Sequence, residues 1–415
     1  MHESRSTAPA ADSASERSGG REHEDGGSRI DRRSILRSVG GVGYALGLSG
    51  VIGIDSALDA PDGTVDVETA YVRSPDSDHL FDEPNAATFE AVTREVPADW
   101  YERVETALDI HAKLVKTRIP GYLNSAVVPG TYDEGTARLS IGVRPNDVAS
   151  LPRDLSGLLS RIGIDWGDSL DGIAIEIEEA EGVDGLEGDA PTEATQLVAH
   201  GDVDPIPGGV RCETNHNFAT LTPALYRSDA STPLFGTALH AFPDWDAASG
   251  DELALPTIHD DEPRTIGHVV DALPDLDVAI ARPARSARPG SVLGRNGSLP
   301  VVGQYTLWGL ADLVARGEDV LKIGGTSGTS SGAVHGIDAA TCVTTDRCRR
   351  GQLKWGSETD ISDGDSGSVT VNADRDDVDG AIVASINSAR TWWPGQDHVW
   401  GVAAHELTDR HGYHF

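Results

Sequence analysis

Gly364-Asp365-Ser366-Gly367-Ser368 is the stretch of this 415-residue chain that says most about its fold and its chemistry. A serine nucleophile needs its hydroxyl on a tight turn, with backbone N–H groups aimed where a carbonyl oxygen becomes negatively charged. Glycines on both sides permit such a turn because they adopt backbone angles that other residues avoid. The N–H groups of Gly364 and Ser366 would then form an oxyanion hole. A generic Asp/Gly/Ser turn has the same composition. Whether Ser366 is a nucleophile therefore depends on whether the chain also offers a base and an acid to activate it.

A candidate base and a candidate orienting acid both precede this serine. The base has to be a histidine within reach of the serine and held by a buried carboxylate. His240 closes the apolar stretch that begins at Pro233, and Asp277 stands at the head of the run Val278-Ala279-Ile280. The chain order is therefore His, Asp, Ser, which differs from the order in subtilisins and in α/β-hydrolases.

Residues 212–415 resemble the trypsin-like serine proteases, and look closest to the streptogrisin and α-lytic branch of that family. The pentapeptide around Ser366 is similar to the family's Gly-Asp-Ser-Gly-Gly. Four more segments resemble family motifs in the same order: Thr237–His240, Asp277–Ile280, the glycine-rich Lys322–Gly332 and the terminal Glu406–Tyr413. The resemblance extends over the C-terminal half of the chain.

The resemblance implies a mainly β fold with two six-stranded antiparallel barrels, preceded here by a small α/β module. His240 and Asp277 would come from the first barrel and Ser366 from the second. Ser366 would attack a peptide carbonyl, His240 would take its proton and return it to the leaving amine, and Asp277 would fix the imidazole tautomer. Asp365 would anchor the oxyanion loop from below. The expected activity is that of a serine endopeptidase.

Three other residues compete for the roles of base and acid. His216 also precedes an apolar strand, but no apolar run leads into it. His268 lies too close to Asp277 for the family layout, and we expect a surface or strand histidine there. Asp275 competes with Asp277, yet only Asp277 abuts the Val-Ala-Ile run.

The resemblance also implies residues that would contact the substrate. Asp360 lies six residues before Ser366, the offset at which trypsins carry the carboxylate that pairs with Arg or Lys. The bacterial branch varies in the length of this loop, so the offset alone does not establish a preference for substrates with Arg or Lys at the cleaved bond. Ser385-Ile386-Asn387 would be the strand that pairs with the substrate backbone, and Asn387, where glycine is usual, would narrow the pocket.

The three cysteines exclude a disulfide scaffold and give no zinc spacing. Cys342 and Cys348 bracket a short loop, so a bridge between them is expected in an oxidising exterior. Cys212 would then be left as a buried free thiol. Leu239 replaces a small residue of the family motif, and Ala241 stands where a disulfide cysteine is common. These departures leave two alternatives open: an inactive binding module of the same fold, and an esterase using the same triad.

The part of the chain before residue 212 divides into three segments. Residues 1–60 hold a polar start and then Arg32-Arg33 before a glycine-rich apolar run, which resembles a twin-arginine export signal. The run is shorter than the ~20 apolar residues that span a bilayer, so we expect an exported protein with no stable membrane span. Residues 66–190 are predicted to form an α/β module, either a removable pro-region or a permanent accessory, and 191–211 a linker.

Patterning within the 66–190 module predicts its elements. A helix is expected inside 88–117, because Trp100, Val104, Leu108, Ala112 and Val115 recur at spacings of three and four. Strands are expected at 125–128, 137–143 and 172–178, with a helix start at Asn146-Asp147.

The balance of charge restricts the partners of the chain. Asp and Glu number 67 against 33 Lys and Arg, which gives a formal net charge of −34, and only four of the basic residues are lysines. Such a surface has no basic footprint for nucleic acid and is typical of proteins that stay hydrated in concentrated salt. We expect polypeptide substrates, no metal or organic cofactor, and a monomer outside the cell or on its surface.

Overall fold

The computed structural model describes residues 63–73, 89–117, 119–167, 169–183, 203–214, 217–228, 230–243, 249–256, 263–294, 297–344, 347–393 and 396–415. The predicted export signal with Arg32 and Arg33 lies outside these residues, as does the first part of the predicted linker. In the part of the chain that is described, no helix has the length and apolar character needed to cross a membrane.

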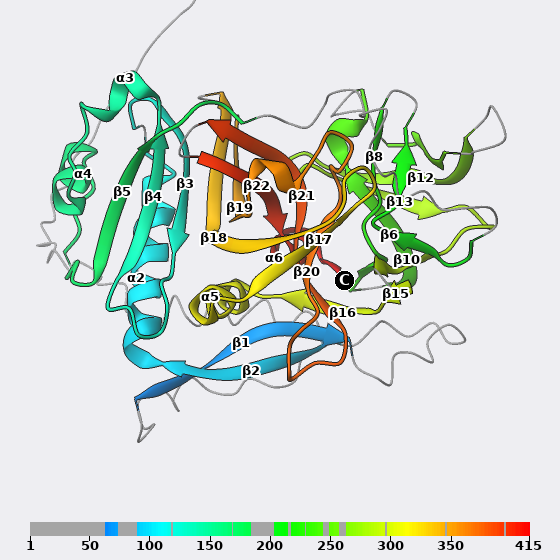
Figure 1. The fold of residues 1–415 in the computed structure, drawn as a ribbon, viewed down its shortest axis with the longest axis horizontal. Helices are drawn as coiled ribbons and strands as arrows, with labels where there is room; N and C mark the ends of the chain where they lie inside the picture. Colours follow the sequence, from blue (N-terminus) through cyan, green and yellow to red (C-terminus); the bar gives the residue numbers. More distant parts are fainter. Residues whose placement is uncertain are drawn as a thin grey trace, which may run out of the picture. The chain divides into compact units, whose positions relative to one another are not determined.

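The strands that follow residue 316 form a closed barrel (Figure 1). Its six strands are β17 (Asp319–Gly324), β18 (Gly328–Thr344), β19 (Arg347–Trp355), β20 (Val369–Asn372), β21 (Ala381–Trp393) and β22 (Gln396–Ala403). They pair antiparallel as a ring, in the order β17, β18, β19, β22, β21, β20 and back to β17. A closed ring leaves no edge strand unpaired, which is how barrels avoid aggregation.

This closed ring is the barrel predicted to come second in the chain; the first barrel is a curled sheet built mainly from the strands that precede it. Its strands are β7 (Arg211–Glu213), β8 (Phe218–Thr220), β9 (Leu225–Arg227), β10 (Ala230–Ala238), β11 (Glu252–Leu255), β12 (Arg264–Leu273), β13 (Val278–Pro283) and the terminal β23 (Tyr413–His414). They pair in the order β23, β9, β10, β13, β12, β11, β7, β8. The Thr222 N–H, just after β8, donates to the Gly236 carbonyl of β10 at 2.8 Å, so the sheet curls back on itself between β8 and β10.

The two barrels share an apolar cluster. Val278 and Ile280 of β13 belong to the same buried cluster as Val369 of β20 and Ile386 of β21. Asp277 and Ser366 stand just ahead of β13 and β20, so this cluster fixes the relative positions of their loops. The predicted fold class, a mainly β fold of two barrel-like sheets, is confirmed; one sheet is a closed ring of six strands, and the other is a curled sheet of eight.

The N-terminal module consists of a hairpin, a long helix and a three-stranded sheet. Its elements are β1 (Thr64–Arg73), β2 (Phe89–Pro97), α2 (Ala98–Leu114), β3 (Tyr122–Val128), β4 (Ala137–Val143), α3 (Pro145–Val148), α4 (Leu155–Arg161) and β5 (Ile173–Glu179). The predicted helix and strands form close to their predicted bounds. The buried face of α2 differs in part, because Ile110 and Leu114 are buried and Ala112 is exposed.

The module is joined to the second barrel by strand pairing and by a common core. β3 pairs antiparallel with β18, so the module's sheet continues that of the barrel. β1 pairs with β16 (Val301–Tyr305), which in turn pairs with β21. Trp100 and Val104 of α2 share a core with Leu353 and Trp355 of β19. Removal of the module would therefore expose apolar surface of the barrel.

The remaining elements connect these layers. They are β6 (Ile206–Gly208), β14 (Pro289–Gly294), β15 (Gly297–Leu299), α5 (Leu307–Arg316), α6 (Ala404–His411) and the short helices η4 (Leu239–Ala241) and η5 (Glu358–Asp360). β6 lies inside the 191–211 stretch predicted as a linker and pairs in parallel with β14. The described end of that stretch is therefore already part of the β structure.

Candidate active site

Ser366 lies on a tight turn immediately before β20. Gly364 and Gly367, on either side, both have φ of 86°, in the region that favours glycine. A Cβ at Gly367 would lie 2.3 Å from the Thr220 carbonyl oxygen, so there is also no room for a side chain. The glycines of the motif are thus required by both backbone angle and space.

His240 bridges Asp277 and Ser366. Its Nδ1 lies 2.6 Å from Asp277 Oδ2, and its Nε2 lies 2.8 Å from Ser366 Oγ. The His240 backbone N–H donates to Asp277 Oδ1 at 2.9 Å, so one carboxylate holds the ring and the chain that carries it. His240 lies on η4 after β10, and the three side chains meet where loops of the two barrels come together. The structure therefore brings all three predicted residues into hydrogen-bond contact.

Asp277 is held as a buried carboxylate. Burial alone would raise the pKa of this carboxyl group, but the charges of His240 and Arg349 and two hydrogen bonds from His240 outweigh burial and leave the pKa below its ordinary value. The Asp277 carbonyl also accepts the Leu239 N–H at 3.0 Å, with φ of 60° at Asp277. An ionised Asp277 keeps the Nδ1 proton on His240 and leaves Nε2 free to accept the Ser366 hydroxyl proton.

Two backbone amides near Ser366 are available to an incoming oxygen. The N–H groups of Asp365, Gly367 and Ser368 donate to carbonyls within the loop and on β21. The N–H groups of Gly364 and Ser366 have no hydrogen-bond partner among the described residues. These are the two amides that the sequence predicts as an oxyanion hole.

Asp365 fastens the serine loop to the second barrel through a buried ion pair. Its Oδ2 accepts from Lys322 Nζ at 2.9 Å, and both side chains are completely buried. Its Oδ1 accepts the Thr326 N–H at 2.8 Å and the Ser327 N–H at 3.1 Å. The anchoring position predicted for Asp365 is the one that these contacts describe, and they also explain the lysine in the Lys322–Gly332 segment.

Thr220 of the first barrel secures the same loop from the other side. Its N–H donates to the Ser366 carbonyl at 2.8 Å, and its Oγ1 donates to the Gly364 carbonyl at 2.9 Å. The Thr220 carbonyl accepts from Thr237 Oγ1, and Thr237 lies three residues before His240. The serine and histidine loops are therefore linked through a single threonine.

The predicted substrate-contacting residues are already engaged in other contacts. Asp360 Oδ2 accepts the Ser357 N–H at 2.8 Å and closes a capping box on η5. Ser385 Oγ pairs with Thr370 Oγ1. The Asn387 side-chain amide links Trp355 Nε1 and Ser368 Oγ, each at 3.0 Å. Contact of these three side chains with a substrate stays a prediction.

The structure also places the cysteines and the competing residues. Cys342 and Cys348 are joined by a disulfide across β18 and β19. Cys212 is a buried free thiol, and burial raises its pKa to about 12. His268 is exposed on β12, and Asp275 pairs with His411 at 3.1 Å, while His216 lies outside the described residues.

Two charged residues near the triad make contacts that the sequence does not predict. Lys322 opens the glycine-rich Lys322–Gly332 segment, but nothing in the sequence predicts that its side chain pairs with Asp365. Arg349 Nη1 lies 2.9 Å from Asp277 Oδ2, although nothing in the sequence around it resembles a site motif. Its contact depends on how the β18–β19 hairpin packs against the first barrel.

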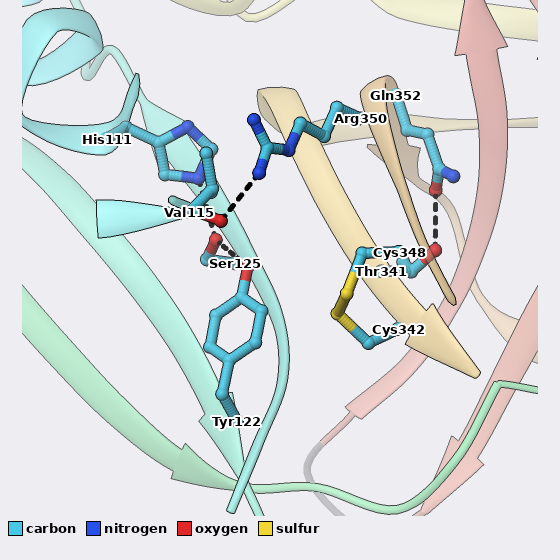
Figure 2. Close-up of a disulfide and its surroundings, with 9 residues drawn as sticks. All are labelled: His111, Val115, Tyr122, Ser125, Thr341, Cys342, Cys348, Arg350 and Gln352. Carbon is cyan, nitrogen blue, oxygen red and sulfur yellow. Dashed lines mark hydrogen bonds between the residues drawn. A yellow bond between two sulfur atoms is a disulfide. The ribbon is translucent and has the colours of Figure 1, made fainter. Parts of the chain in front are cut away.

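A second Ser-His-Asp group joins the module to the barrel. His111 of α2 lies with Nε2 2.7 Å from Ser125 Oγ and with Nδ1 3.0 Å from Asp338 Oδ2. Tyr122 Oη lies 2.6 Å from the same Ser125 hydroxyl (Figure 2). Among the described residues, no group of three or more His, Cys, Asp or Glu side chains is arranged to hold a metal ion.

Comparison with known proteins gives similarity only at the level of solved structures. No family model matches the chain, and no curated protein matches it. A glutamic-acid-specific serine protease is 16% identical, with 50% of this chain and 99% of that chain covered and a TM-score of 0.38. A Nocardiopsis protease is 13% identical over 50% of this chain and 97% of its own, with a TM-score of 0.37. A Cellulomonas bogoriensis chymotrypsin is 15% identical over the same shares, with a TM-score of 0.36. The case for a function therefore rests on the geometry of the residues themselves.

Proposed function

We propose that this chain is a serine endopeptidase that cleaves polypeptides through an acyl-enzyme intermediate. One observation carries the proposal: His240 lies 2.6 Å from Asp277 and 2.8 Å from Ser366, and Ser366 stands on a glycine-flanked turn. This combination of an oriented base and a presented serine is what nucleophilic catalysis by serine requires. The choice of a polypeptide as substrate follows the family resemblance of the C-terminal half.

In the proposed mechanism, Ser366 Oγ attacks the carbonyl carbon while its proton passes to His240 Nε2. Asp277 stabilises the imidazolium that forms and keeps the ring in place, without itself taking a proton. The oxygen of the tetrahedral intermediate accepts from the Gly364 and Ser366 amides. His240 then gives the proton to the leaving amine, and a water molecule repeats the sequence to release the acyl group.

Asp365 and Thr220 support this chemistry without touching the substrate. The oxyanion amides are separated by the Asp365 residue itself, so its buried contacts to Lys322 and to the Thr326 and Ser327 amides restrict both of them. Thr220 restricts the carbonyls of Gly364 and Ser366. A pre-organised donor pair is worth most when it does not have to be ordered during the reaction.

We further propose that the protein acts outside the cell after export through the Arg32-Arg33 signal. Its acidic, lysine-poor composition suits an environment of concentrated salt. The 66–190 module is then either a pro-region that is removed after folding or a permanent part of the enzyme. The length of the mature protein in culture medium distinguishes these two possibilities.

The decisive experiment is labelling with a fluorophosphonate probe in molar salt, with the full chain and a Ser366→Ala variant. We expect the full chain to label and the variant to lose labelling by at least about a thousandfold, because only an activated serine reacts with the probe. Labelling that persists in Ser366→Ala would place the reactive serine elsewhere. Folded protein freed of residues 1–211 that still does not label would instead favour the binding-module alternative, and labelling without peptide cleavage would favour the esterase.

A further inference from the structure

Asp277 contacts two side chains from different barrels, His240 and Arg349. The Oδ2 atom that lies 2.6 Å from His240 Nδ1 also lies 2.9 Å from Arg349 Nη1. Asp277 is fully buried and the Arg349 side chain is 17% exposed, so the pair is shielded from most solvent. In the part of the chain that is described, His240 and Arg349 are the ionisable neighbours that hold the pKa of Asp277 below its ordinary value against the effect of burial.

The disulfide hairpin determines where Arg349 lies. Cys348, directly before Arg349, is bonded to its cross-strand partner Cys342. Arg349 Nη1 also lies 3.4 Å from Ser388 Oγ on β21. The neighbouring Arg350 points to the module instead, and its Nη2 donates to the Val115 carbonyl at 2.7 Å (Figure 2). The two adjacent arginines of β19 therefore bind on opposite sides of the hairpin, Arg349 to Asp277 of the first barrel and Arg350 to Val115 of the module.

We propose that Arg349 is a positioning residue that fixes the Asp277 carboxylate and limits how readily His240 is protonated. The proposal rests on the serine endopeptidase function, because it concerns the same triad. Arg349 does not touch the reacting atoms. It acts through Asp277, as a permanent positive charge on the carboxylate that faces the imidazole.

The physical argument concerns charge near His240. An imidazolium next to Asp277 alone is stabilised by one opposite charge, whereas Arg349 supplies a like charge beyond that carboxylate. Neutral His240 is the form that accepts the serine proton, so the like charge keeps the base usable to lower pH. Burial of the pair limits screening by salt, so the effect should persist in molar salt.

The test measures the pH dependence of fluorophosphonate labelling for the full chain and three variants. Arg349→Gln removes the charge with similar size, and Arg349→Lys retains a charge. Arg350→Gln is the matched control, because it makes the same charge change one residue away on the opposite side of the hairpin. For Arg349→Gln we expect the midpoint of the acid limb to move to higher pH by about one unit. For Arg350→Gln and Arg349→Lys we expect smaller shifts, below roughly half a unit.

Coincident acid limbs for the full chain and Arg349→Gln would overturn the proposal, as would an equal shift in Arg350→Gln. Proton NMR of the His240 ring against pH provides a second readout that needs no activity and is applied to the same variants. If neither the full chain nor folded protein freed of residues 1–211 labels, the endopeptidase function fails. The role of Arg349 is then decided by whether Arg349→Gln moves the His240 titration to higher pH or leaves it unchanged.

Discussion

Two Ser-His-Asp groups in this chain have almost the same hydrogen-bond pattern on different backbones. In the first, His240 lies 2.6 Å from Asp277 and 2.8 Å from Ser366; in the second, His111 lies 3.0 Å from Asp338 and 2.7 Å from Ser125. Asp277 and Asp338 are also the two non-glycine residues of the described chain with positive φ, at 60° and 45°. The side chains alone do not distinguish a candidate catalytic site from a structural contact.

The backbone around each serine does distinguish them. Ser366 stands on a turn whose Gly364 and Ser366 amides have no partner in the described chain. Ser125 lies inside β3, in register with Ile141 of β4 on one side and Ala340 of β18 on the other. Its hydroxyl is also bonded to Tyr122. The second group therefore cross-links the module to the barrel, whereas the unpartnered Gly364 and Ser366 amides of the described chain fit the oxyanion hole proposed for the first.

The largest effect is expected at the ion pair beneath the first group. Lys322→Met would leave the Asp365 carboxylate buried without its cation, which typically costs about 3–5 kcal/mol. Because Asp365 restrains the loop of Ser366, we expect loss of labelling as well as loss of stability. Chemical denaturation and fluorophosphonate labelling of the same preparation measure both.

The double variant Lys322→Met/Asp365→Asn provides the control for this prediction. It removes the unpaired charge, so it should recover much of the lost stability. A single Lys322→Met variant as stable as the original chain would contradict the importance of this pair.

For Ser125, the serine of the second group, we expect a smaller loss of stability and no loss of labelling. Ser125→Ala removes the shared partner of His111 and Tyr122, and leaving buried polar groups unsatisfied costs about 1–3 kcal/mol. Labelling by the fluorophosphonate should remain within about twofold, because Ser366 and its amides are untouched. Ser366→Ala should show the reverse, with labelling lost and the free energy of unfolding nearly unchanged. Loss of labelling in a folded Ser125→Ala variant would erase the distinction between the two groups.

The local parts of the candidate site could be predicted from the sequence. A serine on a tight turn requires neighbours with positive φ. Glycine adopts such angles easily, so Gly364 and Gly367 predict the turn within one pentapeptide. His240 and Asp277 could be found because apolar strands flank them. The capping box of Asp360 also follows a sequence pattern, because Ser357 stands three residues earlier, whereas the offset from Ser366 predicts a substrate contact for the same side chain.

The parts that depend on packing between distant strands could not be predicted. Arg349 meets Asp277 only because the disulfide hairpin lies against the first barrel. The alternation of side chains along β21 places Ser385 and Asn387 in buried contacts, and a shift of one residue reverses the face that a side chain occupies. The pairing of β3 with β18 likewise joins segments that the sequence separates by a predicted linker.

The smallest expected effect is on how the free energy of unfolding changes at alkaline pH, and it involves Tyr122 beside the second group. Burial raises the pKa of Tyr122 to about 12, against an ordinary value of 10.0. Between these values the unfolded chain loses the phenol proton while the folded chain keeps it, so this contribution to stability is present below pH 10 and lost as the pH rises towards 12. Tyr122→Phe should therefore unfold more easily than the original chain at pH 8, by about 1 kcal/mol for the lost hydrogen bond to Ser125. The difference should narrow by pH 11, because the variant lacks the titrating group. Denaturation curves at the two pH values provide the comparison, and a difference that is constant with pH would show that Tyr122 does not stay protonated in the folded protein.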